Sequence, residues 1–180
     1  MIPKLRIALL AFTASLLLDV LTKYFVARHL VFSDRIEVVE GFFYLTHVRN
    51  PGAAFGLFAS APATWRLGFF IGISLLALGI VVSFFRKLAP GDRLSSLALG
   101  FIAGGALGNL IDRIFRHEVV DFLHFKLWQG YSWPDFNLAD SFIVIGVSLL
   151  VLELFASEGE AISDPPGSDA RSSVRLPARD

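Results

Sequence analysis

Two aspartates, Asp121 and Asp140, stand in otherwise apolar sequence. Asp121 interrupts "EVVDFLHF" (118–125), and Asp140 lies near the start of "FNLADSFIVIGVSLLVLELF" (136–155). Two carboxyl groups held close together cannot both ionise easily, so one keeps its proton while the other accepts a proton from water. The activated water can attack a carbonyl carbon while the protonated acid donates to its oxygen, and neither a metal nor a cofactor is required. As a pair, the two residues would suit hydrolysis.

Each aspartate taken alone has a simpler explanation. Asp140 is an acceptable first-turn acid, where the helix dipole favours negative charge, and Asn137 is an acceptable helix cap. Asp121 alternates with apolar neighbours in the manner of an exposed strand residue. Only the elements that carry them can decide between a cap, a surface charge and a reaction centre.

The composition indicates a membrane protein. The 180 residues are 54% hydrophobic and 18% charged, with a mean hydropathy of +0.63, which is too apolar for a soluble domain of this length. A formal net charge of +0 gives no reason to expect a nucleic-acid partner. With 0 Cys, the chain has no disulfide, thiolate ligand or cysteine nucleophile.

Four stretches approach the roughly 20 apolar residues that a membrane-spanning helix needs. They are residues 7–30, 65–85, 94–114 and 137–155. The first resembles a signal peptide in its charged and apolar regions, but it continues to Leu30 without a small-residue cleavage site, which favours a retained helix. We therefore expect one integral membrane domain, 1–156, that is mainly α-helical with four transmembrane helices.

Basic residues predict the orientation of these helices. Lys4 and Arg6 precede the first span, and Arg86, Lys87 and Arg93 crowd the loop between the second and third. Both termini should then be cytoplasmic, with the loops 31–64 and 115–136 outside. "RIEVVE" and "GFFYLTHVR" in the first outer loop predict short strands, and the polar tail 157–180 is typical of a disordered segment.

Polar residues inside the spans need partners or a function, because burying charge in a bilayer is costly. Asp19 and Lys23 are four residues apart and share a helix face, so they can form a self-contained ion pair or support a nearby site. Asn109, Asp112 and Arg113 form a polar face at the end of the third span, where Asp112 and Arg113 could be only an interfacial ion pair. Gly100, Gly104 and Gly108, one strip on the same span, predict close helix packing.

The predicted orientation brings these polar groups to one depth. The third span runs outward and the fourth runs inward, so their polar ends should meet at the outer face, with Asp121 on the connection between them. This shared depth is the reason for proposing that Asp121 and Asp140 form a pair.

Other chemistries fit less well. "HEVVD" (117–121) differs from the zinc-protease pattern HExxH in its last ligand and reads as strand rather than helix. No strand precedes the glycine-rich third span, which argues against a phosphate cradle. Ser74, Ser83 and Ser141 lack the nearby Lys or His of a serine peptidase. Two alternatives from other classes are a proton-coupled transporter that uses Asp19 and a membrane scaffold without chemistry.

Five motifs resemble the lipoprotein signal peptidases, also called signal peptidase II. In order along the chain they are "DVLTK" (19–23), "NPGAAFG" (50–56), "GGALGNLIDR" (104–113), "VVDF" (119–122) and "FNLADS" (136–141). The resemblance implies an aspartyl endopeptidase of the bacterial inner membrane with four transmembrane helices and a small extracytoplasmic β-rich cradle. Its substrates would be diacylglyceryl-modified prolipoproteins held in membrane lipid, cleaved just before the lipidated cysteine. It also implies inhibition by the cyclic peptide globomycin.

The resemblance assigns roles by motif. Asp121 and Asp140 match the catalytic dyad, with no metal and no cofactor. The remaining matches are substrate-binding or supporting residues: Asn50, Gly52, Asn109, Asp112, Arg113, Asn137, Asp19 and Lys23.

Overall fold

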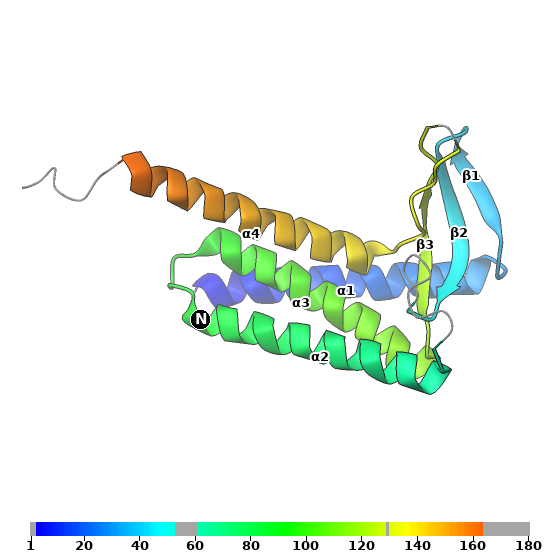
Figure 1. Cartoon of the computed structure of the whole chain (residues 1–180), viewed down its shortest axis with the longest axis horizontal. Helices are drawn as coiled ribbons and strands as arrows, with labels where there is room; N and C mark the ends of the chain where they lie inside the picture. The colour runs from blue at the N-terminus through cyan, green and yellow to red at the C-terminus, as the bar shows by residue number, and fades with distance from the viewer. Residues whose placement is uncertain (1–2, 53–60, 129, 164–180) are drawn as a thin grey trace, which may run out of the picture.

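The computed structural model describes residues 3–52, 61–128 and 130–163, with side chains to residue 156. It contains four long helices and three strands (Figure 1). In chain order they are α1 (Pro3–His29), β1 (Arg35–Val39), β2 (Phe43–Asn50), α2 (Ala63–Lys87), α3 (Arg93–Arg116), β3 (Val119–Phe125) and α4 (Leu138–Ser163). The predicted four-helix membrane fold with a small sheet is confirmed.

Helix α3 is the centre of the bundle and packs against α1, α2 and α4. Its glycine strip faces α1, where Gly100 lies against Ala8 and Ala11, and Gly104 lies against Phe12 and Ser15. Side chains larger than hydrogen would hold the two backbones apart. The packing role predicted for this strip is confirmed.

The three strands form an antiparallel sheet in the order β1-β2-β3. Figure 1 shows the sheet at one end of the bundle, rising across the helix axes. Strand β1 falls within the predicted segment 35–40, and β2 matches the predicted segment 41–49 except that it extends one residue further, to Asn50. Beyond β3, the backbone of Phe136 pairs with Leu123 and so places the start of α4 beside the sheet.

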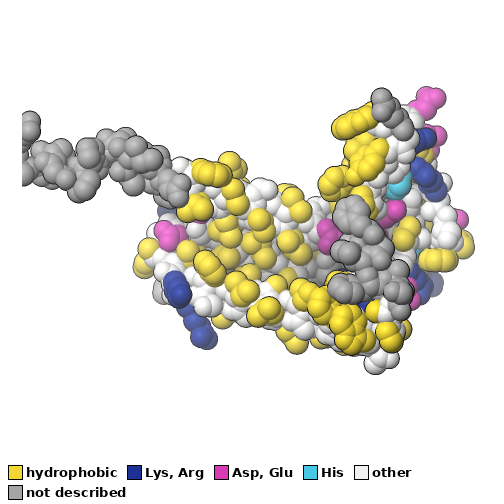
Figure 2. Space-filling view, in the orientation of Figure 1, with side chains coloured by type: hydrophobic (Ala, Val, Ile, Leu, Met, Phe, Trp, Pro, Cys, Tyr) yellow, Lys and Arg dark blue, Asp and Glu magenta, His cyan; other side chains and the backbone are white. Residues whose placement is uncertain are grey.

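All four helices are long and apolar enough to cross a membrane. Many of their large apolar side chains point away from the bundle, for example Leu10, Leu21, Leu76 and Val144. Figure 2 shows hydrophobic side chains over most of the visible bundle face, with charged side chains mainly at its two ends. Such a surface is stable against lipid rather than water, and the chain is a multi-pass membrane protein.

Helix α4 extends beyond the boundary at residue 156 that the sequence predicted. Its membrane-spanning part is Leu138–Ala156, and the helix continues to Ser163. The rest of the predicted disordered tail, 164–180, lies outside the described residues, as does 53–56 of the "NPGAAFG" motif.

Candidate active site

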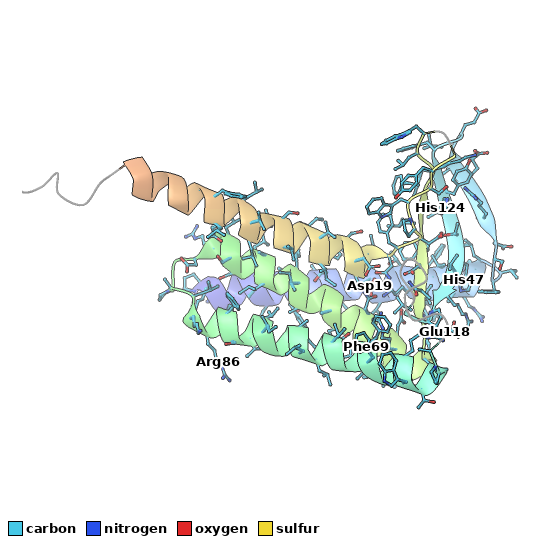
Figure 3. All side chains as sticks on the ribbon, in the orientation of Figure 1. Asp19, His47, Phe69, Arg86, Glu118 and His124 are labelled. Atoms are coloured by element: carbon cyan, nitrogen blue, oxygen red, sulfur yellow. The ribbon has the colours of Figure 1, made fainter. Side chains whose placement is uncertain are left out.

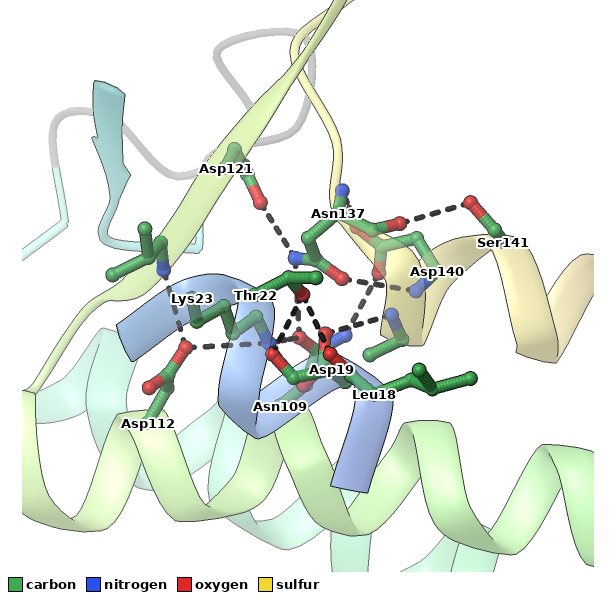
Figure 4. A network of polar contacts seen from close by, with 12 residues as sticks. Leu18, Asp19, Thr22, Lys23, Asn109, Asp112, Asp121, Asn137, Asp140 and Ser141 are labelled. Carbon is green, nitrogen blue, oxygen red and sulfur yellow. Dashed lines mark hydrogen bonds and ion pairs between the residues drawn. The ribbon is translucent and has the colours of Figure 1, made fainter. Parts of the chain in front are cut away.

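Strand β3 and the first turn of α4 bring Asp121 and Asp140 into one polar network (Figure 4). Asp121 is 2% exposed, so its interpretation as a surface strand residue is wrong. Its two carboxylate oxygens accept hydrogen bonds from the side-chain amides of Asn50 and Asn137, at 2.9 and 2.7 Å.

Asp140 is a helix-capping residue and also a member of this network. Its backbone N–H donates to Asn137 Oδ1 at 3.0 Å, while its Oδ2 accepts from the Asn137 N–H at 3.3 Å, which is a reciprocal capping arrangement. Its other oxygen, Oδ1, accepts from Asn109 Nδ2 on α3 at 2.8 Å. The cap explains why an acid is tolerated here and fixes the direction of its carboxylate.

The fully buried amide of Asn137 links the two acids. Its Nδ2 donates to both Asp121 Oδ1 and Asn109 Oδ1, the latter at 3.2 Å. Asn109 in turn donates to Asp140. The carboxyl groups are therefore joined through two amides, one on α3 and one directly before α4, and moving either amide would disturb both acids.

Next to the amides that link the two acids, Lys23 is buried at 1% exposure among three hydrogen-bond acceptors. Its ammonium contacts Asp19 at 2.7 Å, Asn109 at 2.9 Å and Asp112 at 3.2 Å. The predicted Asp19–Lys23 pair is present, but its interpretation as self-contained is wrong. The ion pair supports Asn109 directly.

Asp19 and Asp112, the two acids that contact Lys23, also hydrogen-bond to the backbone of the elements that carry the site. Asp19 accepts the Ala139 N–H at 2.8 Å, and Asp112 accepts the Val120 N–H at 3.2 Å. Ala139 precedes Asp140, and Val120 precedes Asp121. The cluster of Asp19, Lys23 and Asp112 therefore fixes the backbone one residue before each candidate catalytic acid.

Asp112 and Arg113, which were predicted to share one polar face of α3, point in different directions. Asp112 points inward to Lys23 and pairs with Arg116 at 3.2 Å, so the proposed Asp112–Arg113 ion pair is wrong. Arg113 instead lies over the Phe70 ring, 5.2 Å from its centroid, and lines a pocket of about 230 Å³. Adjacent residues on a helix point about 100° apart, which accounts for the division.

Asn50, Gly52 and Asp140 border the same pocket as Arg113. Gly52 has a φ of 104°, and its N–H donates to Asn50 Oδ1 at 2.9 Å, which orients the amide toward Asp121. A Cβ at Gly52 would overlap the Phe70 ring. Both backbone conformation and space therefore require glycine here.

Sequence reasoning missed the apolar wall of the pocket, which consists of Phe70, Trp133, Pro134 and Phe136. A signal was available for three of them, since "WPDF" (133–136) directly precedes Asn137 and its last residue, Phe136, begins the motif "FNLADS". Phe70 gave no such signal because it is one of several aromatic residues in α2.

Burial, and after it the negative charge of Asp140, raise the pKa of Asp121 from 3.8 to about 7. Hydrogen bonds from Asn50 and Asn137 oppose this shift without cancelling it. A carboxyl group with this pKa can hold or release a proton near neutral pH, as acid–base catalysis requires.

The remaining candidates near the site have structural contacts. Ser141 donates to the Asn137 carbonyl at 3.0 Å, as expected of a residue that supports the helix start. His117, in "HEVVD", is the left-handed C-cap of α3. Among the described residues, no group of three His, Asp or Glu side chains is placed to hold a metal ion.

Comparisons with known proteins agree with this architecture. Residues 11–156 match the family model described as signal peptidase (SPase) II. The chain is 44% identical over 156 residues to the lipoprotein signal peptidase of Geobacter sulfurreducens, covering 87% of this chain and 96% of that protein. It is 42% identical over 145 residues to that of Syntrophus aciditrophicus, covering 81% and 89%.

A solved bacterial membrane enzyme superposes with a TM-score of 0.76 at 34% identity, covering 86% of this chain and 90% of that one. A second bacterial membrane enzyme superposes at 0.73 with 35% identity, covering 82% and 91%. Sequence and fold therefore lead to one assignment, that this chain belongs to the signal peptidase II family and is a membrane peptidase that removes signal peptides from lipoproteins.

Proposed function

We propose that Asp121 and Asp140 are the catalytic dyad of an aspartic endopeptidase, which cleaves diacylglyceryl-modified prolipoproteins just before the lipidated cysteine. The observation that carries the proposal is the amide linkage through Asn137 and Asn109, which places two carboxyl groups from separate elements in one buried network beside a pocket. Surface acids or independent helix caps do not need such a linkage.

In the proposed mechanism, Asp121 holds the proton and Asp140 is ionised. Asp140 accepts a proton from water, and the resulting hydroxide attacks the carbonyl carbon of the scissile bond. Asp121 donates its proton to the carbonyl oxygen as that carbon becomes tetrahedral. The proton on Asp140 then passes to the departing amine as the C–N bond breaks, and one hydroxyl of the intermediate returns its proton to Asp121 as the new carboxyl group forms, which restores the starting state of the dyad. The pKa of about 7 for Asp121 supports this division of roles.

The supporting residues have complementary tasks in this mechanism. Asn50, Asn109 and Asn137 orient the two carboxyl groups. Arg113 and Gly52 border the pocket where substrate backbone and lipid head would bind. Asp19, Lys23 and Asp112 hold the backbones that carry the dyad.

We further propose a location in the bacterial inner membrane, with both termini in the cytoplasm and the active site near the extracytoplasmic face. The support is the clustering of Lys4, Arg6, Arg86, Lys87 and Arg93 at the helix ends opposite the sheet, whereas the basic residues on the sheet side are spread more thinly along the chain. Figure 3 shows Arg86 at that end, whereas Asp19, His47 and His124 lie toward the sheet. A globomycin-type cyclic peptide would inhibit by occupying the space between the two aspartates.

The test is cleavage of a diacylglyceryl-modified prolipoprotein in detergent with a metal chelator present, followed by gel shift. Asp121→Asn and Asp140→Asn should each lower kcat by at least about 100-fold, because each removes a proton-transfer group. Asp34→Asn is the matched control, since Asp34 is an exposed acid in the loop between α1 and β1. Normal cleavage by folded Asp140→Asn would reduce Asp140 to a helix cap and overturn the dyad.

A further inference from the structure

A second groove lies on the same side of the bundle as the active-site pocket, near the opposite end of the helices. It has a volume of about 420 Å³ and lies between α2 and α4, with α3 as its floor. Its lining residues include Phe84 of α2 and its C-cap Leu88, Ser95 of α3, and Val151 and Glu153 of α4. All but Ser95 and Glu153 of these are apolar.

This groove continues the path that begins at the dyad. The active-site pocket is bordered by Phe70 of α2 and Asp140 of α4, and the second groove is bordered by the same two helices further along. Asp140 and Glu153 are 13 residues apart, which at 1.5 Å per residue separates them by about 20 Å along α4. Figure 1 shows α2 and α4 on either side of α3 over this length.

Glu153 is an unusual residue for this position. It lies within the membrane-spanning part of α4 and is half-buried, where an unpaired carboxylate is costly. The hydroxyl of Ser95 donates a hydrogen bond to it. Within the described part of the chain, no Lys, Arg or His lies at ion-pair distance from Glu153. One hydroxyl leaves most of its negative charge uncompensated.

Signal peptides have the complementary charge and length. They carry a positively charged segment followed by 7–15 apolar residues before the cleavage site. A helix of about 13 such residues is about 20 Å long, which matches the separation of Asp140 and Glu153. The exposed Arg86 and Lys87 at the same end of the bundle would repel a basic segment, so an acid in the groove is needed to accept it.

We propose that this groove holds the apolar part of the signal peptide and that Glu153 pairs with a Lys or Arg of its basic segment. The inference rests on the proposed dyad and orientation, because these place the scissile bond at the far end of the path. Glu153 would then determine which signal peptides bind well. It would not take part in the chemical step, about 20 Å away.

The test compares three substrates that differ only in the segment before the apolar stretch: basic, neutral with Gln, and acidic with Glu. With the basic substrate, Glu153→Gln should raise KM about 3-fold, as loss of a partly exposed ion pair predicts, and Glu153→Lys should raise it about 10-fold. With the acidic substrate, Glu153→Lys should bind better than wild type. For all of these, kcat should stay unchanged.

Asp92→Asn is the matched control, because Asp92 is an acid at the same end of the bundle but outside the groove, in the turn between α2 and α3. It should leave the preference for basic substrates intact. Ser95→Ala removes the hydrogen bond to Glu153 but keeps the carboxylate, and should also retain the preference.

Three results would overturn the inference. If KM of the Glu153 variants does not depend on substrate charge, Glu153 only packs α3 against α4 or the groove holds a lipid chain. If Asp92→Asn changes the charge preference equally, the general field at this end is responsible. If wild type cleaves no prolipoprotein, the proposed function fails and this inference fails with it.

Discussion

The two halves of α3 use the same glycine strip for different purposes. In the half near Arg93, here called the packed half, Gly100 lies against the backbone of Ala8 and the Cβ of Ala11, with no charged group among these nearest contacts. In the half near Arg116, Gly108 lies against the carboxylate of Asp19, which is paired with Lys23. Small residues bring backbones together in the first half and make room for buried charges in the second.

The difference separates stability from positioning. The packed half holds the helices together by close contact, which tolerates many sequences of similar volume. The polar half contains groups whose partners must all be present, because an unpaired buried charge is costly. That requirement fixes the direction of Asn109 and of the backbones before Asp121 and Asp140.

The largest expected effect comes from removing the cation of the polar half. Lys23→Met leaves Asp19 and Asp112 buried without their shared partner, and should lower the free energy of unfolding by about 3–5 kcal/mol. Denaturant or thermal unfolding in detergent, followed by tryptophan fluorescence, measures it.

Lys126→Met is the control for this change, since Lys126 is exposed at the sheet edge and the same substitution there should have little effect. Equal stability of the two variants would show that the buried ion pair is not needed to hold the polar half together.

A smaller effect is expected in the packed half. Gly104→Ala places a methyl group against Ser15 Oγ and the Phe12 carbonyl, and should cost about 1–3 kcal/mol by forcing α1 and α3 apart. Gly72→Ala on α2 meets no atom within 4 Å and should be neutral or slightly stabilising. A neutral Gly104→Ala, measured by the same unfolding assay, would contradict close packing as the role of the strip.

The smallest expected effect is the change in stability over one pH unit near neutrality. Because the folded-state pKa of Asp121 is raised from 3.8 to about 7, the folded protein binds this proton more tightly than the unfolded chain. Its contribution to stability is full below about pH 4 and is lost as pH rises through 7. Between pH 6 and 7 the loss is at most about 1.4 kcal/mol.

Asp121→Asn should remove this part of the pH dependence, whereas Asp34→Asn should keep the wild-type slope. Unfolding free energies at pH 5, 6, 7 and 8 measure the slope of each variant. An unchanged slope in Asp121→Asn would mean that Asp121 is ionised throughout this range in the folded protein.

Local patterns were sufficient for much of the fold. The spans followed from runs of apolar residues, the strands from β-branched and aromatic residues, and the packing face of α3 from glycines at every fourth position. The shared depth of the polar residues was enough to select Asp121 and Asp140 as candidates, because helix direction alone sets depth in a membrane.

What each polar side chain contacts was decided by tertiary structure. Lys23 meets Asn109 across 86 residues, and Asp19 meets the Ala139 backbone across 120 residues. The sequence contains no local trace of these contacts, so Asp19 and Lys23 were interpreted as a pair of their own, and Asp112 was assigned to the wrong arginine. Composition and periodicity determine that an element forms and which face is apolar, whereas the rotation of neighbouring helices about their axes determines which buried charges meet.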